Sequence, residues 1–61
     1  MPEIIVYLVE GRSDAAKKSL MKDITDAAIK NLGSKPDAVT VQLVESSKTS
    51  KSKAGIPYSE L

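Results

Sequence analysis

The sequence predicts an α/β fold built on a single β-α-β unit with a short C-terminal turn or hairpin. Three features predict it: a β-branched apolar run near the N-terminus, a long segment with helical periodicity, and a valine-rich run near residue 40. Because the chain has 61 residues, we expect one domain over residues 1–61. The two strands are expected to pair in parallel, with a right-handed crossover through the helix.

The first strand is expected over residues 3–9. Ile4, Ile5 and Val6 are β-branched, and the apolar run is nearly continuous instead of alternating. This pattern is typical of a strand that is covered on both faces. Gly11 then interrupts the run, because glycine adopts backbone angles that other residues avoid.

The helix is expected over residues 14–32. Ser13 or Asp14 is a suitable N-cap, and an acidic residue there suits the helix dipole. Gly33 follows at the expected end, and Pro36 prevents the helix from continuing. The apolar stripe consists of Ala16, Leu20, Ile24, Ala27 and Ala28, widened by Met21 and Leu32.

The second strand is expected over residues 39–44, because alternate residues from Val39 to Leu43 are apolar and share one face. Residues 46–53 are polar and low in complexity, which is typical of a mobile loop. Residues 54–58 regain some apolar character, so we expect a short turn or hairpin that docks on a neighbouring subunit.

The composition limits how this chain can be stable and what it can bind. The sequence has no Cys and no His, which excludes disulfides and the usual metal sites. Its net charge of +1 gives no strong attraction to nucleic acid or to an anionic membrane, and no apolar run is long enough to span a bilayer. One helix covers only one face of a two-stranded sheet, so we expect self-association. A cytoplasmic location fits these features.

Pro2 is the first candidate for chemistry. If Met1 is removed, Pro2 becomes a secondary amine at the start of a strand. An α-amino group has an ordinary pKa of about 8, and burial beside a cation lowers that pKa, so the neutral amine can accept a proton. If Met1 is retained, the proline nitrogen is an amide nitrogen without a basic lone pair. The alternative is that Pro2 only begins the strand.

Arg12 is the second candidate, because it precedes a helix N-terminus and can bind a carboxylate through two parallel hydrogen bonds. The alternative is a solvated turn arginine, or one that pairs with Glu10 or Asp14. Tyr58 is expected to be a packing anchor. The tail also offers three lysines that can bind an anion, with a solvated loop as the alternative: Lys48, Lys51 and Lys53.

These residues resemble the 4-oxalocrotonate tautomerase family of the tautomerase superfamily, to which macrophage migration inhibitory factor also belongs. The matching elements are Met1-Pro2 before a short apolar strand, Glu-Gly-Arg-Ser-Asp at residues 10–14, a helix of this length and a valine-rich second strand. The resemblance covers about residues 2–45. It implies a β-α-β protomer whose dimers form a four-stranded sheet with two helices, and a homo-hexamer made of three dimers.

The resemblance also implies a cofactor-free isomerase that acts on small keto and enol acids, such as 2-hydroxydienoates, with a role in aromatic catabolism. Pro2 matches the family's general base, and Arg12 matches an arginine that binds the substrate carboxylate from a neighbouring subunit. A second arginine of the family aligns with Thr40 here, and the loop lacks the family's aromatic residue. Lys51 or Lys53 is a candidate replacement for that missing cation.

Two alternative functions remain open. Related proline-based enzymes dehalogenate or decarboxylate their substrates, and there a protonated Pro2 acts as an acid. The chain can also be a structural or partner subunit of a tautomerase-like oligomer with weak activity of its own. The neutral Thr40 and the lysine-serine loop favour this second alternative, whereas Arg12 argues against it.

Overall fold

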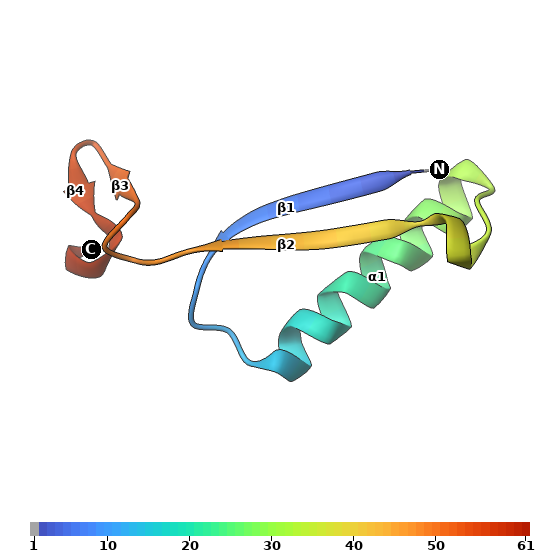
Figure 1. Ribbon diagram of the computed structural model, residues 1–61, viewed down its shortest axis with the longest axis horizontal. Coiled ribbons are helices and arrows are strands. Elements are labelled where there is room, and N and C mark those ends of the chain that lie inside the picture. The colour runs from blue at the N-terminus through green and yellow to red at the C-terminus, as the bar shows by residue number, and fades with distance from the viewer. Residues whose placement is uncertain (1) are drawn as a thin grey trace.

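The computed structural model describes residues 2–61 (Figure 1). A parallel pair of strands and one long helix form the body of the molecule, and a small hairpin with a final 3-10 turn follows. In chain order the elements are β1 (Glu3–Val9), α1 (Asp14–Leu32), the 3-10 turn η1 (Pro36–Ala38), β2 (Thr40–Ser46), β3 (Ser52–Lys53), β4 (Ile56–Pro57) and the 3-10 turn η2 (Tyr58–Glu60). The predicted β-α-β fold is therefore confirmed.

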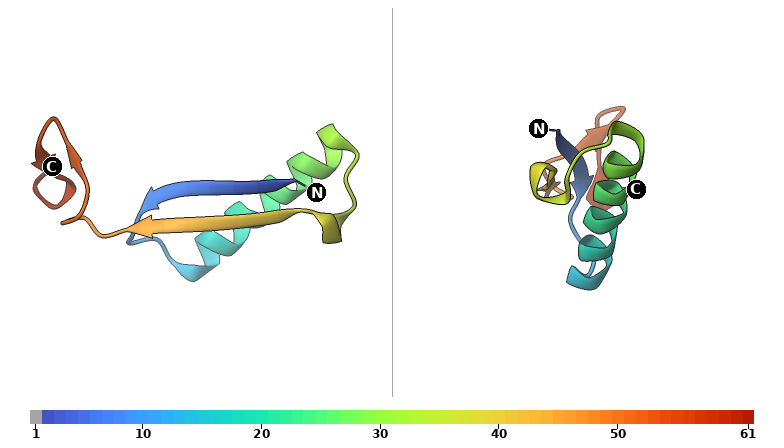
Figure 2. Two further views of the ribbon diagram at one scale, coloured as in Figure 1. Left: turned by 45° about the horizontal axis from the view of Figure 1, so that its top comes forward. Right: turned by 90° about the vertical axis from the view of Figure 1, so that its right-hand side faces the viewer.

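Strands β1 and β2 pair in parallel, in a register that runs from Glu3 opposite Thr40 to Val9 opposite Ser46. Helix α1 lies across one face of this pair (Figure 2). The second strand begins one residue later than predicted, because the N–H of Val39 still closes η1 through a 3.3 Å hydrogen bond to the Pro36 carbonyl. The strand also continues past residue 44 to Ser46, because β1 extends to Val9 and offers a partner to every residue of β2.

Both ends of α1 lie where the sequence predicts them. The Ser13 hydroxyl accepts a 3.1 Å hydrogen bond from the N–H of Ala16, which satisfies one of the free donors of the first turn. Gly33 has a φ of 68°, and its N–H donates to the Ile29 carbonyl over 3.0 Å. This left-handed glycine cap ends the helix at the residue before it.

The two faces of β1 differ in their environment. Burial alternates along the strand, so that Ile4, Val6 and Leu8 are half-buried on the face that α1 covers. On the opposite face Ile5 is 46% exposed and Tyr7 is 72% exposed. The near-continuous apolar run had predicted a strand covered on both faces, but a single chain covers only one. Within residues 2–61, Ala28 is the one buried apolar residue, and it is still 8% exposed.

The C-terminal hairpin stands away from the body of the molecule, beyond the end of β2 (Figure 1). Strands β3 and β4 pair antiparallel through a two-residue turn in which both Ala54 and Gly55 have positive φ, as type I′ hairpins require. Residues 46–53 were predicted as a mobile loop, but Ser46 ends β2 and residues 52–53 form β3. Between these strands lies a turn in which the N–H of Ser50 donates to the Ser47 carbonyl over 3.1 Å. The C-terminal segment thus forms the predicted hairpin.

Candidate active site

Pro2 lies immediately before β1 and is half-buried. Its carbonyl accepts a 3.0 Å hydrogen bond from the N–H of Thr40, so these two residues lie side by side at the same end of the sheet. The Thr40 residue is exposed and neutral. Met1, on whose removal the basicity of Pro2 depends, lies outside the described residues.

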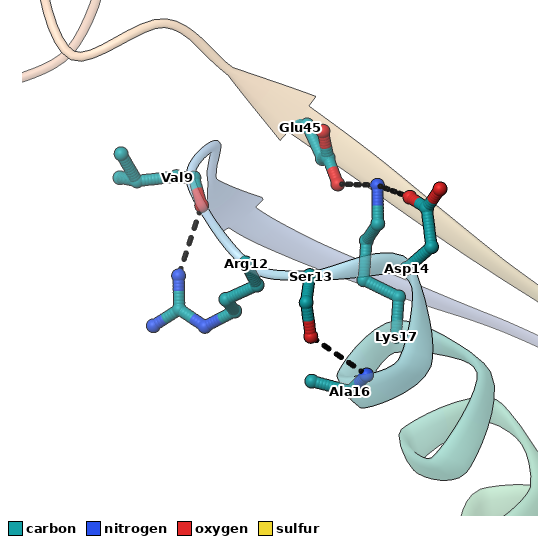
Figure 3. Close-up of polar contacts among 7 residues, drawn as sticks. All are labelled: Val9, Arg12, Ser13, Asp14, Ala16, Lys17 and Glu45. Atoms are coloured by element: carbon teal, nitrogen blue, oxygen red, sulfur yellow. Dashed lines mark hydrogen bonds and ion pairs between the residues drawn. The ribbon is translucent and has the colours of Figure 1, made fainter.

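Arg12 lies at the opposite end of β1, in the connection that leads to α1 (Figure 3). Its Nη1 donates a 2.9 Å hydrogen bond to the Val9 carbonyl, which holds the exposed guanidinium against the end of the strand. Gly11 reaches this position with a φ of 120°. Among residues 2–61 no ion pair links Arg12 to Glu10 or Asp14, so the guanidinium retains donors for a ligand.

Lys17 fixes the start of α1 against the end of β2. Its Nζ lies 2.9 Å from Glu45 Oε1 and 3.4 Å from Asp14 Oδ1 (Figure 3). The hydrogen bond with Glu45 is the main cause that raises the pKa of Lys17. The sequence places Lys17 on the exposed face of the helix, and Glu45 lies 28 residues further along, so periodicity alone gives no signal for this pair. The contact holds the start of α1, where the connection that contains Arg12 ends, against β2 at the residue opposite Leu8.

A groove of about 670 Å³ opens beside Arg12. Residues from the end of β1, from the connection to α1 and from the C-terminal segment line it: Tyr7, Leu8, Val9, Glu10, Gly11, Arg12, Lys48 and Tyr58. A separate groove of about 600 Å³ between α1 and β2 contains the Lys17–Glu45 pair, but neither Pro2 nor Arg12. Unlike the groove between α1 and β2, the groove beside Arg12 contains exposed cationic side chains that have no ion-pair partner within residues 2–61.

Of the three tail lysines, Lys48 is the one that lines this groove with Arg12. Lys51 instead places its Nζ 5.4 Å from the centre of the Tyr58 ring, and Lys53 lies in β3 opposite Ile56. Within a single chain, Lys51 and Lys53, the lysines predicted to replace the missing cation, therefore do not line the groove beside Arg12. One signal was available: parallel strands end at the same edge of a sheet, so the segments that follow β1 and β2 must be neighbours.

A single chain does not bring Pro2 and Arg12 together. They lie at opposite ends of β1, whose 7 residues span roughly 20 Å at about 3.3 Å each. Thr40 lies beside Pro2, and the tail lysines follow the other end of the sheet. A site that uses both Pro2 and Arg12 must therefore combine at least two chains.

Neither a metal site nor a membrane span is found in the described part of the chain. Residues 2–61 contain no group of three or more Asp, Glu, His or Cys side chains that could hold a metal ion. In the same range no helix has the length and apolar character needed to cross a membrane.

Known proteins match this chain over most of its length. The family described as "Tautomerase enzyme" matches residues 2–50. The curated protein "Probable tautomerase bsl7456" from Bradyrhizobium diazoefficiens is 47% identical over 60 residues, which cover 98% of this chain and 90% of that protein.

Solved structures of similar proteins share the fold. A 4-oxalocrotonate tautomerase homologue, TTHB242, has a TM-score of 0.94 at 30% identity, and the match covers 100% of this chain and 97% of that one. A heterohexamer 4-oxalocrotonate tautomerase from Chloroflexus aurantiacus J-10-fl has a TM-score of 0.91 at 26% identity, with 100% and 98% covered. The family predicted from the sequence is confirmed. This chain belongs to the 4-oxalocrotonate tautomerase family of the tautomerases, and it is an isomerase.

Proposed function

We propose that this protein interconverts the keto and enol forms of a small 2-hydroxydienoate or enol carboxylate without a cofactor. The amine of Pro2, freed by removal of Met1, is the general base, and Arg12 of a neighbouring chain binds the substrate carboxylate. The observation that supports this most directly is the exposed guanidinium of Arg12, which makes one backbone hydrogen bond and no ion pair within residues 2–61.

The reaction needs one base and one anion-binding group. The neutral nitrogen of Pro2 takes the hydroxyl proton of the enol, and the electron pair of that O–H bond forms the carbonyl. The carbon–carbon double bond shifts, and the terminal carbon of the conjugated system takes a proton back from the Pro2 ammonium. The product is an isomer of the substrate, and the amine returns to its neutral form. Arg12 holds the carboxylate and stabilises the negative charge that develops next to it.

The separation of Pro2 and Arg12 along β1 supports a site shared between chains. Association of two protomers would bring the Pro2 end of one chain to the Arg12 end of another. The similarity to a solved heterohexamer supports an oligomer in this family, and we propose a homo-hexamer composed of three dimers for this chain.

Substitution of Pro2 tests the base directly. Pro2→Ala leaves a primary amine without the ring that fixes the direction of the lone pair, so it is expected to lower ketonisation of phenylenolpyruvate by at least about a hundredfold, since a misplaced base loses most of its contribution. The oligomer should survive, because only a ring at the edge of the sheet is lost. Turnover equal to that of the parent protein would sink the proposal.

Mixing two inactive variants tests the shared site. Pro2→Ala chains keep Arg12, and Arg12→Ala chains keep Pro2. When the two are unfolded and reassembled together, hybrid oligomers should regain activity, because some sites then receive both intact residues. Each variant reassembled alone is the control. If the mixture stays as inactive as its components, Pro2 and Arg12 do not act across chains.

A second candidate function is that of a partner subunit in a mixed oligomer. The neutral Thr40 beside Pro2 and the similarity to a heterohexamer favour it. Native mass spectrometry of the protein from its natural source separates the two cases. A homo-oligomer of chains that lack Met1 supports the enzyme, whereas a mixed assembly or retained Met1 supports the partner subunit.

A further inference from the structure

We infer that Lys48 determines substrate specificity by binding a second acidic group of the substrate, while Arg12 of the same chain holds the first carboxylate. This inference rests on the proposed function, because it assumes that the groove beside Arg12 receives the substrate. It assigns a role to a lysine whose position relative to Arg12 is evident only in the folded chain.

The first argument is charge. Arg12 and Lys48 line the same groove, where Glu10 is the one acidic residue. Within residues 2–61 the ion pairs are those of Lys17 with Asp14 and Glu45 and that of Lys22 with Asp26. Neither cation of the groove is therefore neutralised by a carboxylate of its own chain in this range. Two uncompensated cations in one groove favour a ligand that has two negative charges.

The second argument is the fixed backbone of Lys48. Its carbonyl accepts a 3.2 Å hydrogen bond from the N–H of Ser59 in η2. The preceding residue, Ser47, makes hydroxyl contacts of 3.1 Å with Thr49 and 2.8 Å with Ser50. A lysine on such a turn has a fixed starting point and a flexible side chain, so its ammonium can reach an anion without moving the loop.

The third argument is elimination among the available cations. Lys51 lies over the Tyr58 ring, Lys53 lies in the hairpin strand β3, and neither lines the groove. Thr40, at the other end of the sheet, has no charge. Lys48 is thus the tail lysine that shares a surface with Arg12.

Arg12 and Lys48 are suited to different contacts with the substrate. The planar guanidinium of Arg12 can hold a carboxylate through two hydrogen bonds, whereas the ammonium of Lys48 acts as a point charge. Tyr58 lines the groove as well and can contact a flat conjugated chain between the two acidic groups. The volume of about 670 Å³ lies within the range of small-molecule sites.

Two unreactive dienoates that differ by one carboxylate test this inference. Muconate has two carboxylates and sorbate has one, and calorimetry on the intact oligomer without Met1 measures the binding of both. Lys48→Ala is expected to weaken muconate binding about tenfold, equivalent to about 1.4 kcal/mol, and to change sorbate binding by less than about twofold. Lys48→Arg should restore muconate binding, and Lys30→Ala, which removes an equal charge at the far end of α1, should leave both unchanged.

Three outcomes would overturn the inference: equal weakening of both ligands in Lys48→Ala, no weakening of either, or no preference of the parent protein for muconate. None of them depends on turnover, so they are distinct from a failure of the proposed function. Conversely, the expected binding pattern together with full activity of Pro2→Ala would support Lys48 and refute the proposed base.

Discussion

Arg12 is held by the backbone of the strand that precedes it. The 2.9 Å hydrogen bond from Nη1 to the Val9 carbonyl occupies one side of the guanidinium and directs the remaining N–H groups away from the strand. Because the side chain is exposed, its free edge is available to a carboxylate. Lysine at this position would preserve the charge but could not make the backbone contact and two parallel hydrogen bonds at the same time.

Arg12→Lys is therefore expected to lower kcat/KM for an enol carboxylate about tenfold or more, since hydrogen bonds to charged groups contribute about 1.5–3 kcal/mol each. Arg12→Ala should lower it further, because the charge is lost as well. Steady-state kinetics on both variants measure separately the effect of losing the paired hydrogen bonds and the effect of losing the charge. If Arg12→Lys retains kcat/KM within about twofold of the parent, the guanidinium does not act as a bidentate clamp.

At the scale of elements, Lys17 connects α1 to β2. Its contact with Glu45 joins two segments 28 residues apart, and the side chains are only 25% and 32% exposed. Lys22 also forms a pair, with Asp26 over 3.0 Å, but that pair lies within one helix and its side chains are 74% and 56% exposed. Hydrogen bonds to the carboxylates raise the pKa of both lysines above the ordinary value of 10.5. The two pairs differ in burial and in whether they link separate elements.

Lys17→Met is expected to lower the free energy of unfolding at neutral pH by more than Lys22→Met, because only the first variant disconnects two elements. The sign with pH follows from the raised pKa. A cation whose pKa is higher in the folded state stabilises the fold fully below its ordinary value of 10.5, and this stabilisation is lost as the pH rises through the folded value. Urea unfolding of the parent protein and both variants at pH 8 and above pH 11 measures how the free energy of unfolding changes. If Lys17→Met lowers the free energy of unfolding by the same amount above pH 11 as at pH 8, the loss comes from the packing of the lysine methylene groups and not from the charge.

The sequence predicted those elements whose determinants are local. Ser13 and Gly33 mark the ends of α1 as expected, because capping depends on the residues next to the helix. The start of β2 was misplaced by one residue, since the turn at Pro36 extends to Val39. Contacts between distant segments were not predictable from periodicity. These include the Lys17–Glu45 pair and the position of Lys48, both of which depend on how the ends of β1 and β2 meet.

At the scale of the whole molecule, a single chain leaves too much apolar surface uncovered. The extents of 42 × 23 × 14 Å and the radius of gyration of 14.4 Å describe an elongated body, whereas a compact chain of this length has a radius of about 10–11 Å. Ile5, Tyr7 and Val44 are exposed on the sheet face opposite α1. Burial of a fully exposed apolar side chain contributes about 1.5–3 kcal/mol, and these three are roughly half exposed, so covering them contributes a few kcal/mol, a substantial share of the stability of a small domain.

Folding and association are therefore expected to be one coupled process. The melting temperature of the parent protein should rise with protein concentration, because mass action favours the associated folded state. Ile5→Asp should abolish the oligomer and leave the chain largely unfolded at micromolar concentration, since an ionised carboxylate cannot be buried in an apolar interface without a partner. Ile5→Val, which keeps the surface apolar, is the matched control and should remain assembled. Sedimentation and circular dichroism, measured over a dilution series, follow assembly and folding in the same samples. A folded monomer of Ile5→Asp, with a melting temperature independent of concentration, would mean that α1 and two strands suffice for stability and that the exposed sheet face does not need a second chain.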